Sequence, residues 1–600
     1  MLELLINGIS VPLPKGTAIT MEWNNMIKDP RTLPGSYSYP FTLARSEQVD
    51  TLLGRPYRVA GGGIFSSPEA LIRFNGVTLP MGLLKIDAST ERTHQVHILG
   101  SAYPVLTEAN LCDIQMHQYN LGAGDLRSRT WHESVAGSAY INLIRDSITK
   151  QYPQEKFVAA PLRVKSPTME GSAVGMSRNN FFGTFLNFFQ EGDFVSQGSR
   201  DCSHFRCFPM PYVGYVLDAI MGGSLTNNAF TQSDLARLVM PTIYHKNSLL
   251  SANHDVVIDT TGASDNHYFR LNSFLPAYPA KEFMRNLLQI FGMGIYGNLE
   301  GYEFITYQDV IAGVGVVDWS KKMTDAYTVE PDPGKGYKYG YSSEEGTDEM
   351  AQDRTVQHMI DLETAELGEG ELEEEDRQFF VKDTRQLMQI DRHDLSYQDD
   401  QGQTVNTTIR RYKTITSGLY GNQEAPDGVD MTSDIGPFPM TLAHYQGSTD
   451  LSPTSWSKVV DEQRRTWYVP FTESTLMEKI YTPSILFYRG MVSRGGDNPG
   501  VYPCVSATNK DINGNTLGEL SLEWSGPSGL YEKFHKGFAG WVRKDKKRLK
   551  ATFRLTIQDI RDLNMKHQVY VLGERWIVET LRVSLYSDRM GLAEAELLSV

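Results

Sequence analysis

Three short clusters in the sequence hold the residue types that metal binding, acid–base catalysis or anion binding would need. The stretch 202–207 (CSHFRC) places two cysteines around a histidine, but a zinc site needs about four ligands and no second pair follows. The stretch 391–394 (DRHD) sets carboxylates beside a histidine, the groups of general acid–base catalysis. The stretch 543–550 (RKDKKRLK) is the one strongly basic run. The favoured interpretations are buried thiols for the first cluster and a surface ion pair for the second.

For the basic run, the favoured interpretation is a solvated strand end or ion pairing with an acidic stretch of the same or a neighbouring subunit. Nucleic acid or another acidic partner is the alternative. The sequence contains no phosphate-binding loop of the G-x-x-x-x-G-K-[ST] type, no H-E-x-x-H and no G-x-S-x-G. We therefore predict that the chain is not an enzyme, binds no cofactor and has no catalytic or metal-binding residues.

Composition excludes several further classes. The chain has 600 residues and a formal net charge of −15, which makes generic nucleic-acid or anionic-membrane binding unfavourable. Four cysteines are too few for a disulfide framework. No apolar run reaches about 18 residues, and the opening residues lack the features of a signal peptide. We expect several domains, synthesis in a cytoplasm and no membrane span.

The elements that would position such groups are mostly strands. Near the N-terminus, Tyr37, Tyr39, Phe41 and Leu43 alternate with smaller residues, which predicts a strand with one apolar face. Pro40 has no N–H for a sheet ladder, so this strand is expected at an edge. A short helix that ends at Gly54 should follow it.

Asn-Gly pairs mark tight hairpins at both ends of the chain. Asn7-Gly8, Asn75-Gly76 and Asn513-Gly514 separate runs with strand character, and Asn-Gly tolerates the positive φ angles of a type I′ turn. Two further strands are expected around Gly573. Residues 1–105 and 501–600 are therefore predicted as two β-domains.

The region between them mixes helices with hairpins. The stretch 179–190 (NNFFGTFLNFFQ) has the spacing of a helix buried on a broad face, with a partner contact as the alternative. Residues 213–220 and 284–291 show apolar side chains at helical spacing, each followed by glycine. The second of these helices should lead into a hairpin around Ile295 and Phe304.

The predicted fold class is multidomain α+β and β-rich, with two β-barrel-like domains bracketing α/β subdomains. Residues 343–376 are acidic and poor in large apolar side chains, which is typical of a solvated loop. The predicted domains are an N-terminal β-barrel-like domain (1–105), a mixed domain with the Phe-rich helix (106–205), an α/β subdomain (206–330), an acidic linker region (331–385), an irregular β region (386–500) and a C-terminal β-barrel-like domain (501–600).

Several patches resemble the baseplate or tail-tip hub proteins of phages and prophages of the Bacteroidetes type. The stretch 36–54 (SYSYPFTLARSEQVDTLLG) is similar to a segment near the N-terminus of such tail proteins. The unit 211–223 (PYVGYVLDAIMGG), the helix–hairpin unit that ends in VDWSKK, and the C-terminal stretch from 522 to 583 are similar to further parts of that family. Together these patches cover about half of the chain.

The resemblance implies a homotrimer in which each subunit contributes two β-barrel-like domains to a ring. It implies a structural virion protein that closes the distal end of the tail tube and carries spike or receptor-binding components. The implied partners are the tail tube or distal tail protein, spike or fibre proteins and the tape-measure protein, and nucleic acid is not among them. The implied location is the tail tip of the virion after synthesis in the bacterial cytoplasm.

Under this resemblance, Tyr37, Tyr39, Phe41 and Leu43 become candidate subunit-interface residues, because edge strands pair readily with another chain. For Tyr39 and Phe41, a place in the core of their own domain is the alternative. Two other functions stay open. A distal tail adapter or receptor-recognition protein would stack glycans on aromatic residues in TSWSKVV (454–460) and RRTWYVPF (464–471). A glycoside or peptidoglycan hydrolase would need two carboxylates in a cleft, about 5–10 Å apart.

Overall fold

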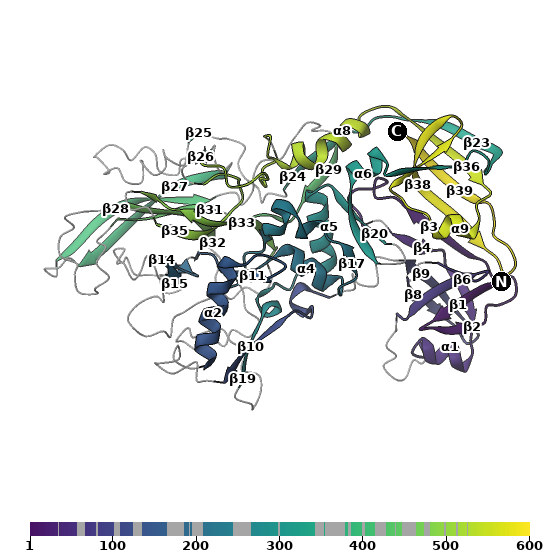
Figure 1. Cartoon of the computed structure of the whole chain (residues 1–600), viewed down its shortest axis with the longest axis horizontal. Helices are drawn as coiled ribbons and strands as arrows, with labels where there is room; N and C mark the ends of the chain where they lie inside the picture. The colour runs from purple at the N-terminus through teal and green to yellow at the C-terminus, as the bar shows by residue number, and fades with distance from the viewer. Residues whose placement is uncertain are drawn as a thin grey trace.

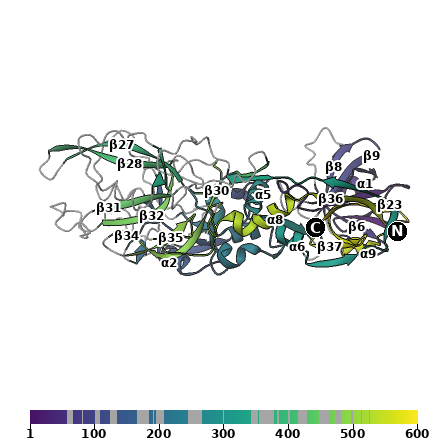
Figure 2. The ribbon, with the colours of Figure 1, turned by 90° about the horizontal axis from the view of Figure 1, so that it is seen from above.

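The computed structural model describes the residues 1–33, 35–56, 67–79, 82–100, 109–123, 135–164, 185–190, 192–194, 208–243, 266–297, 301–341, 353–354, 378–381, 386–398, 403–414, 428–438, 440–446, 464–472, 481–496, 500–511, 514–524 and 526–600. The described residues are β-rich, with 45% strand and 20% helix, and a β-rich chain was predicted. The molecule is elongated, and its N- and C-terminal strands lie together at one end (Figures 1 and 2).

A single sheet of 15 strands forms that end of the molecule. Its strands are β1 (Leu2–Ile6), β2 (Ile9–Val11), β3 (Ile19–Asn24), β4 (Ser36–Ser38), β5 (Phe41–Ala44), β6 (Glu69–Phe74), β7 (Val77–Thr78), β8 (Gly82–Ser89), β9 (Thr93–Gly100), β22 (Gly315–Asp318), β23 (Met323–Asp332), β36 (Lys546–Phe553), β37 (His567–Val571), β38 (Glu574–Leu585) and β39 (Ala593–Ser599). The main order is β2-β1-β6-β8-β9-β4-β3-β38-β39-β36-β23, with β5 and β7 paired to β9 and β6, and β22 paired to β37, which also pairs with β38.

The strands β3 and β38 join the two ends of the chain. They pair antiparallel from Ile19↔Leu585 to Asn24↔Thr580. One continuous core cluster lies beneath both halves and includes Leu4 and Val96 from the N-terminal part and Trp576 and Leu597 from the C-terminal part. The predicted pair of β-barrel-like domains is therefore not confirmed, because the described strands form one open sheet over a shared core. The predicted domain boundaries stay predictions.

The C-terminal strands of this sheet curl strongly. The edge strands β22 and β23 lie at opposite ends of the series β22-β37-β38-β39-β36-β23, yet only residues 319–322 connect them. An extended chain covers about 3.5 Å per residue, so the two edges approach within about 18 Å. The connecting turn bonds to both sides: Trp319 N donates to Tyr570 O at 3.0 Å, and Arg554 N donates to Lys322 O at 2.7 Å.

The Asn-Gly hairpins follow the sequence prediction where the structure describes them. Asn7 and Gly8 have φ angles of 49° and 78°, and Asn75 and Gly76 have 47° and 82°. These pairs connect β1 to β2 and β6 to β7. The short helix after β5 is also confirmed as α1 (Glu47–Leu52), capped by the Ser46 side chain.

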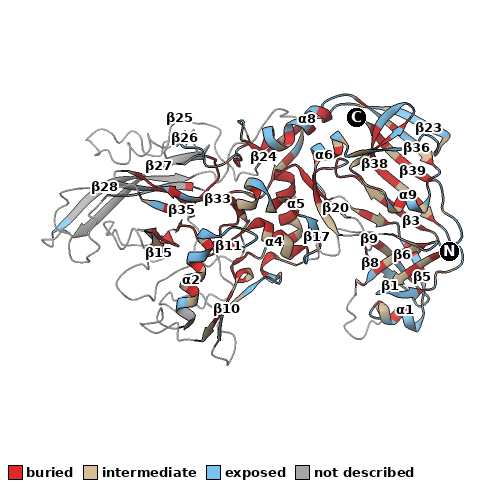
Figure 3. Ribbon diagram, in the orientation of Figure 1, coloured by how far each residue is buried: buried red, intermediate tan, exposed pale blue. Residues whose placement is uncertain are grey.

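The centre of the molecule contains the predicted helices. They are α4 (Val213–Ile220) and α5 (Ala280–Ile290), whose apolar faces are buried, and Gly222 and Gly292 end them with positive φ. The hairpin of β20 (Met293–Gly297) and β21 (Tyr302–Thr306) follows α5 as expected. Further α-helices among the described residues are α2 (Val135–Thr149), α6 (Tyr307–Ala312), α8 (Lys536–Val542) and α9 (Ile557–Arg561), and a π-helical turn, η8 (Tyr531–His535), precedes α8. Figure 3 shows this central body as mostly buried.

The predicted Phe-rich helix is wrong over its described part. Phe185–Leu186 forms β13 and Phe189–Gln190 forms β14. Between them, Asn187 has a φ of 53°, and its side chain bonds to Ala160 O, Phe208 O and Phe208 N. This polar anchor interrupts any helix, and the aromatic side chains pack in a small cluster against Trp467. Phe181 and Phe182 lie outside the described residues.

The remaining strands form small sheets, several of them at the other end of the molecule (Figure 1). These strands are β10 (Gln118–Ala123), β11 (Phe157–Val158), β12 (Leu162–Val164), β15 (Asp193–Phe194), β16 (Met210–Pro211), β17 (Leu225–Asn227), β18 (Leu238–Val239), β19 (Asn266–Arg270), β24 (Tyr337–Tyr341), β25 (Asp353–Arg354), β26 (Gln378–Val381), β27 (Gln386–Gln398), β28 (Thr404–Thr414), β29 (Val429–Ser433), β30 (Gly436–Pro437), β31 (Met440–Gln446), β32 (Arg464–Thr472), β33 (Ser484–Ser493), β34 (Gly495–Gly496) and β35 (Val501–Ser506).

Candidate functional site

The four candidate interface residues divide between two environments. Phe41 and Leu43 are buried in the core beneath the large sheet, whereas Tyr37 is half-buried and Tyr39 is 36% exposed. In β4 the buried residues are Ser36 and Ser38, whereas in β5 they are Phe41 and Leu43. The buried positions shift from even to odd numbers because Tyr39 and Pro40, between the two strands, are both exposed. The prediction of one continuous apolar face is therefore wrong, and a core position describes Phe41 and Leu43.

The edge prediction also applies to only half of the stretch. The strand β4 lies between β3 and β9, so it is not an edge. Among the described strands, β5 pairs with β9 alone. A role for Tyr37 and Tyr39 in a subunit contact stays a prediction.

Both tyrosines converge on a carboxylate that the sequence did not single out. Glu22 on β3 is 2% exposed. It accepts hydrogen bonds from Tyr37 Oη at 2.7 Å, from Tyr39 Oη at 2.8 Å and from Arg582 Nη2 of β38 at 2.8 Å. The Arg582 guanidinium also lies over the Tyr39 ring, 5.1 Å from its centroid. The cluster thus fastens β4 and β38 to β3 at the place where the two ends of the chain meet.

The electrostatics of this cluster favour the ionised carboxylate. Burial alone would raise the pKa of Glu22, but the hydrogen bonds from Tyr37, Arg582 and Tyr39 lower that pKa to about 2. Burial and the neighbouring Glu22 carboxylate raise the pKa of Tyr37 and of Tyr39 above the usual value. The phenols therefore stay protonated donors at neutral pH and do not act as bases.

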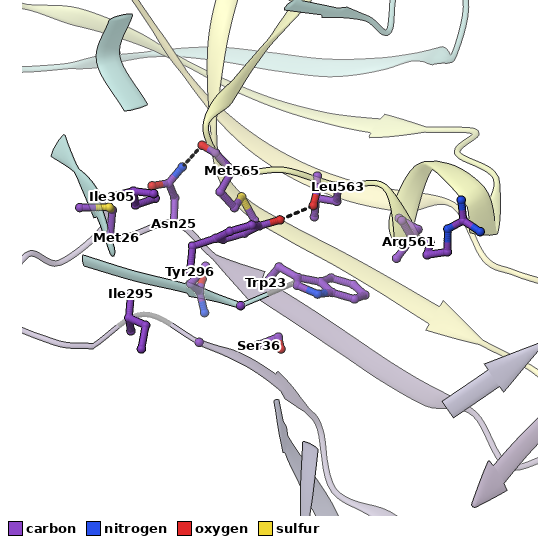
Figure 4. A pocket seen from close by; sticks show the side chains of 14 residues that line it. Trp23, Asn25, Met26, Ser36, Ile295, Tyr296, Ile305, Arg561, Leu563 and Met565 are labelled. Carbon is purple, nitrogen blue, oxygen red and sulfur yellow. Dashed lines mark hydrogen bonds between the residues drawn. The ribbon is translucent and has the colours of Figure 1, made fainter. Parts of the chain in front are cut away.

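A small cavity lies beside the paired strands β3 and β38, which form the seam between the two ends of the chain. Three parts of the chain meet at this cavity. It has a volume of about 70 Å³ and is lined by Trp23 of β3, Tyr296 of β20 and Met565 before β37, among others. Figure 4 shows these side chains converging. Ligand pockets are typically about 300–1,000 Å³, so the cavity is too small for a sugar or a nucleotide. It marks a packed junction.

Hydrogen bonds from buried side chains hold that junction. Asn25 is 2% exposed, and its Nδ2 donates to Met565 O at 3.1 Å and to Val578 O at 3.0 Å. The Tyr296 hydroxyl donates to Leu563 O, as Figure 4 shows. The N-terminal sheet, the central hairpin and the C-terminal strands are thereby connected by directional bonds as well as by packing.

The basic run pairs with carboxylates of the same chain. Arg548 on β36 contacts Asp332, Glu579 and Glu596, and Lys547 and Lys550 bond to Glu574 and Glu330 at 2.7 and 2.8 Å. The prediction of ion pairing within the chain is confirmed. These three cations are therefore paired with carboxylates of the same chain.

A Ser–His–Asp constellation appears that the sequence analysis missed. Ser89 Oγ lies 2.9 Å from His94 Nδ1, and His94 Nε2 lies 2.7 Å from Asp50 Oδ1. Serine hydrolases use the two ring nitrogens the other way round. His94 is fully buried, and Arg45 pairs with Asp50 at 3.0 Å. The geometry describes a structural link between α1 and the β8–β9 hairpin, with no access for a substrate to the imidazole.

The remaining motifs contribute no site within the described residues. The stretch 202–207 and nearly all of 343–376 lie outside these residues, and 391–394 lies on β27, whose side chains the structure does not describe. Trp467, proposed for glycan stacking, is 1% exposed and unavailable to a sugar, and Trp456 lies outside the described residues. No helix in the described part is long and apolar enough to cross a membrane, and no group of three or more metal-ligating side chains was found there.

The chain resembles several solved structures of known proteins. No protein-family model and no curated protein matches the chain. Among solved structures, the chain aligns with the 43 kDa tail protein of prophage MuSo2 from Shewanella oneidensis, at 7% identity and a TM-score of 0.27, over 99% of this chain and 97% of that one. It aligns with a tail protein from Neisseria meningitidis MC58 at 7% identity and a TM-score of 0.27, over 100% and 96% of the two chains.

The third alignment is with prophage tail protein gp18 from Listeria monocytogenes EGD-e. It has 6% identity and a TM-score of 0.27, and it covers 100% of this chain and 94% of the other. All three similar structures are tail proteins, and two of them come from prophages. Alignments with a TM-score of 0.27 do not assign a function to this chain.

Proposed function

We propose that the chain is a structural subunit of a phage tail, located at the tail tip or baseplate as a hub subunit. In this role it closes the distal end of the tail tube and carries the spike or receptor-binding components. The proposal begins from the sequence resemblance of 36–54, 211–223 and 522–583 to phage hub proteins. It requires neither a cofactor nor chemistry.

The observation that carries the proposal is the joining of the chain ends in one curved sheet. Strands from 1–100, 315–332 and 546–599 form a broad β surface at one end of the molecule, while other sheets project from the opposite end (Figures 1 and 2). In this proposal, the large sheet would form the ring, and the sheets at the opposite end would carry the spike or receptor-binding components. The seam is held by the Glu22 and Asn25 hydrogen bonds, so the ring-forming part would be rigid.

The proposed assembly is a homotrimer in the virion tail tip, formed after synthesis in the host bacterial cytoplasm. Its partners would be the tail tube or distal tail protein, the spike or fibre and the tape-measure protein. Oligomers with cyclic symmetry form closed rings when the same pair of surfaces meets around an axis.

The test is the mass of the purified full chain, followed by averaging of particle images. A closed trimer has a mass of 3 × 67.5 = 202.5 kDa, and the images should show a threefold ring with a central opening. A monomer that binds a glycan array, and does not bind purified tail tubes, would overturn the hub proposal. That result would favour the receptor-recognition alternative.

A further inference from the structure

Three buried polar atoms in the centre of the molecule have no hydrogen-bond partner among the described residues. They are Tyr339 Oη on β24, Trp524 Nε1 in the segment before η8, and His535 Nδ1 at the end of η8. Tyr339 and Trp524 are 1% exposed and His535 is 0% exposed. Because an unpaired buried polar group costs free energy, each such group calls for an explanation.

The three side chains contact one another. The ring centroids of Tyr339 and His535 are 4.6 Å apart, those of Trp524 and His535 are 5.3 Å apart, and those of Tyr339 and Trp524 are 5.7 Å apart. The His535 ring is tilted by 46° and 41° against the other two rings, so it stacks flat on neither. The three unpaired atoms therefore belong to one cluster of touching rings, although no hydrogen bond joins any two of them.

The hydrogen-bonding roles of the three atoms are complementary. His535 Nε2 donates to Ile290 O at 2.8 Å. Burial lowers the pKa of His535 to about 4, so the imidazole is neutral at pH 7 and its Nδ1 can only accept a hydrogen bond. The indole Nε1–H of Trp524 can only donate, and the Tyr339 hydroxyl can do either.

Two backbone features set His535 apart. A side-chain carbon at Gly292, the residue that ends α5, would lie 3.5 Å from His535 Nδ1 and 2.9 Å from Phe534 O. Glycine therefore leaves this side of the imidazole free of a side chain. His535 also closes η8, which is a π-helical turn, and single π-helical turns frequently occur at functional sites.

A molecule that bridges these atoms must both accept and donate hydrogen bonds. A metal cation is unsuitable because an indole N–H offers no lone pair, and an anion is unsuitable because Nδ1 has no proton to donate. Water accepts and donates, and buried waters typically make about three hydrogen bonds to polar groups that otherwise lack partners. The burial of all three side chains excludes a larger molecule.

We propose that the cluster of Tyr339, Trp524 and His535 is a binding site for one buried water molecule. The water accepts a hydrogen bond from Trp524 Nε1–H, donates one to His535 Nδ1 and forms a third with Tyr339 Oη. It thereby connects η8 to β24, while His535 holds the end of α5 through its other ring nitrogen. The site lies in the central body of the molecule and does not depend on the proposed tail function.

The first test asks whether the Trp524 indole proton lies next to water. The full chain is prepared deuterated with isotope-labelled tryptophan, which gives one indole signal for each of the eight tryptophans. Trp524→Phe and Trp576→Phe assign the two signals needed. The Trp524 N–H should show a nuclear Overhauser cross-peak to water. Trp576 is the matched control and should show none, because it is 2% exposed and its Nε1 donates to Val571 O at 3.1 Å.

Tyr339→Phe separates the bound water from the tyrosine hydroxyl. The cross-peak at Trp524 should persist in this variant, because the water keeps Trp524 and His535 as partners. Hydrogen exchange of the amides at 531–542 should become about threefold to tenfold faster, because one hydrogen bond of the water is lost. A dry, unpaired hydroxyl would give the opposite sign, since its removal would relieve an unpaired buried group.

The proposal is overturned if the Trp524 cross-peak is absent, or if Trp576 shows one of equal strength. Loss of the Trp524 cross-peak in Tyr339→Phe overturns it too, because the signal would then come from the hydroxyl proton. Exchange at 531–542 that is unchanged or slower in Tyr339→Phe likewise contradicts the bridging water.

Discussion

Acid should weaken the packing of α5 against η8 through one histidine. His535 is fully buried at the end of η8, and its Nε2 donates to Ile290 O, at the end of α5, over 2.8 Å. Its ring packs against Tyr339 and Trp524 at centroid distances of 4.6 and 5.3 Å. Burial lowers the pKa of His535 from 6.5 to about 4, although the bond to Ile290 opposes that shift.

The direction and size of the effect follow from linkage. The unfolded chain binds the proton more tightly than the folded chain, so stability is complete above about pH 6.5 and falls as the pH decreases towards 4. A pKa difference of 6.5 − 4 corresponds to about 3 kcal/mol in total, and about 2 kcal/mol of this is lost at pH 5. The region around η8 should therefore open much more often at pH 5 than at pH 7.5.

Hydrogen exchange measured by mass spectrometry gives the local opening free energy in a chain of this size, where global unfolding need not be two-state. Peptides covering Ile290 and 531–542 would be followed at pH 7.5 and pH 5, after correction for the intrinsic effect of pH on exchange. The control is His535→Gln, which keeps an N–H donor and removes the titration. The unmodified chain should lose about 2 kcal/mol more than this variant. Equal losses in the two proteins would refute the reasoning.

Three further predictions concern the seam and the sheet core. Glu22→Gln should lower the local opening free energy of β3 and β38 by about 1–3 kcal/mol, measured by hydrogen exchange of their amides, because Arg582 loses its buried carboxylate; Arg31→Gln, which breaks only an exposed pair with Asp29, should change it little. Phe41→Ala should cost about 3–5 kcal/mol in the same assay, since Phe41 is 5% exposed, and a change below about 1 kcal/mol would show that this side chain is not core. Asn25→Ala should increase exchange of the amides at 563–579 relative to those of α4, because two carbonyls lose their donor; unchanged exchange there would contradict a role for Asn25 at the junction.

Local chemistry was the part of the fold that the sequence predicted well. The Asn7-Gly8 and Asn75-Gly76 turns, and the helices that end at Gly222 and Gly292, depend on backbone preferences within a few residues. The helix prediction for the Phe-rich stretch was wrong, although the spacing of its apolar side chains fits a helix. Its course is instead decided by Asn187, whose partners Ala160 and Phe208 lie about 20 or more positions away.

The contacts of the candidate residues could not be predicted for a similar reason. Tyr37 and Tyr39 were singled out as candidate interface residues, but their hydrogen-bond partner Glu22 gives no local signal in the sequence. Its other partner, Arg582, lies 560 positions along the chain. Contacts of such separation arise from the pairing of β3 with β38, which spacing within one segment does not encode. The same holds for the three carboxylates around Arg548.

The strand β38 shows where a closer reading of periodicity would have helped. Its core-facing residues are Trp576 and Val578 in the first half, but Leu581, Val583 and Leu585 in the second. The core-facing positions thus change from even to odd residue numbers. Such a change indicates a β-bulge, because one extra residue exchanges the two faces of a strand. The ladder with β39 shifts register between Val578 and Thr580.

The bulge lies where β38 changes partners. Before it, β38 pairs with β37, and after it, β38 pairs with β3. The bulged residue Glu579 accepts a hydrogen bond from Asn25 N through its carbonyl and holds Arg548 through its carboxylate. One inserted residue thus keeps both halves of the strand apolar towards the core and binds the two ends of the chain together. The parity change in residues 574–585 was visible in the sequence, and it identifies the strand that joins the two halves of the sheet.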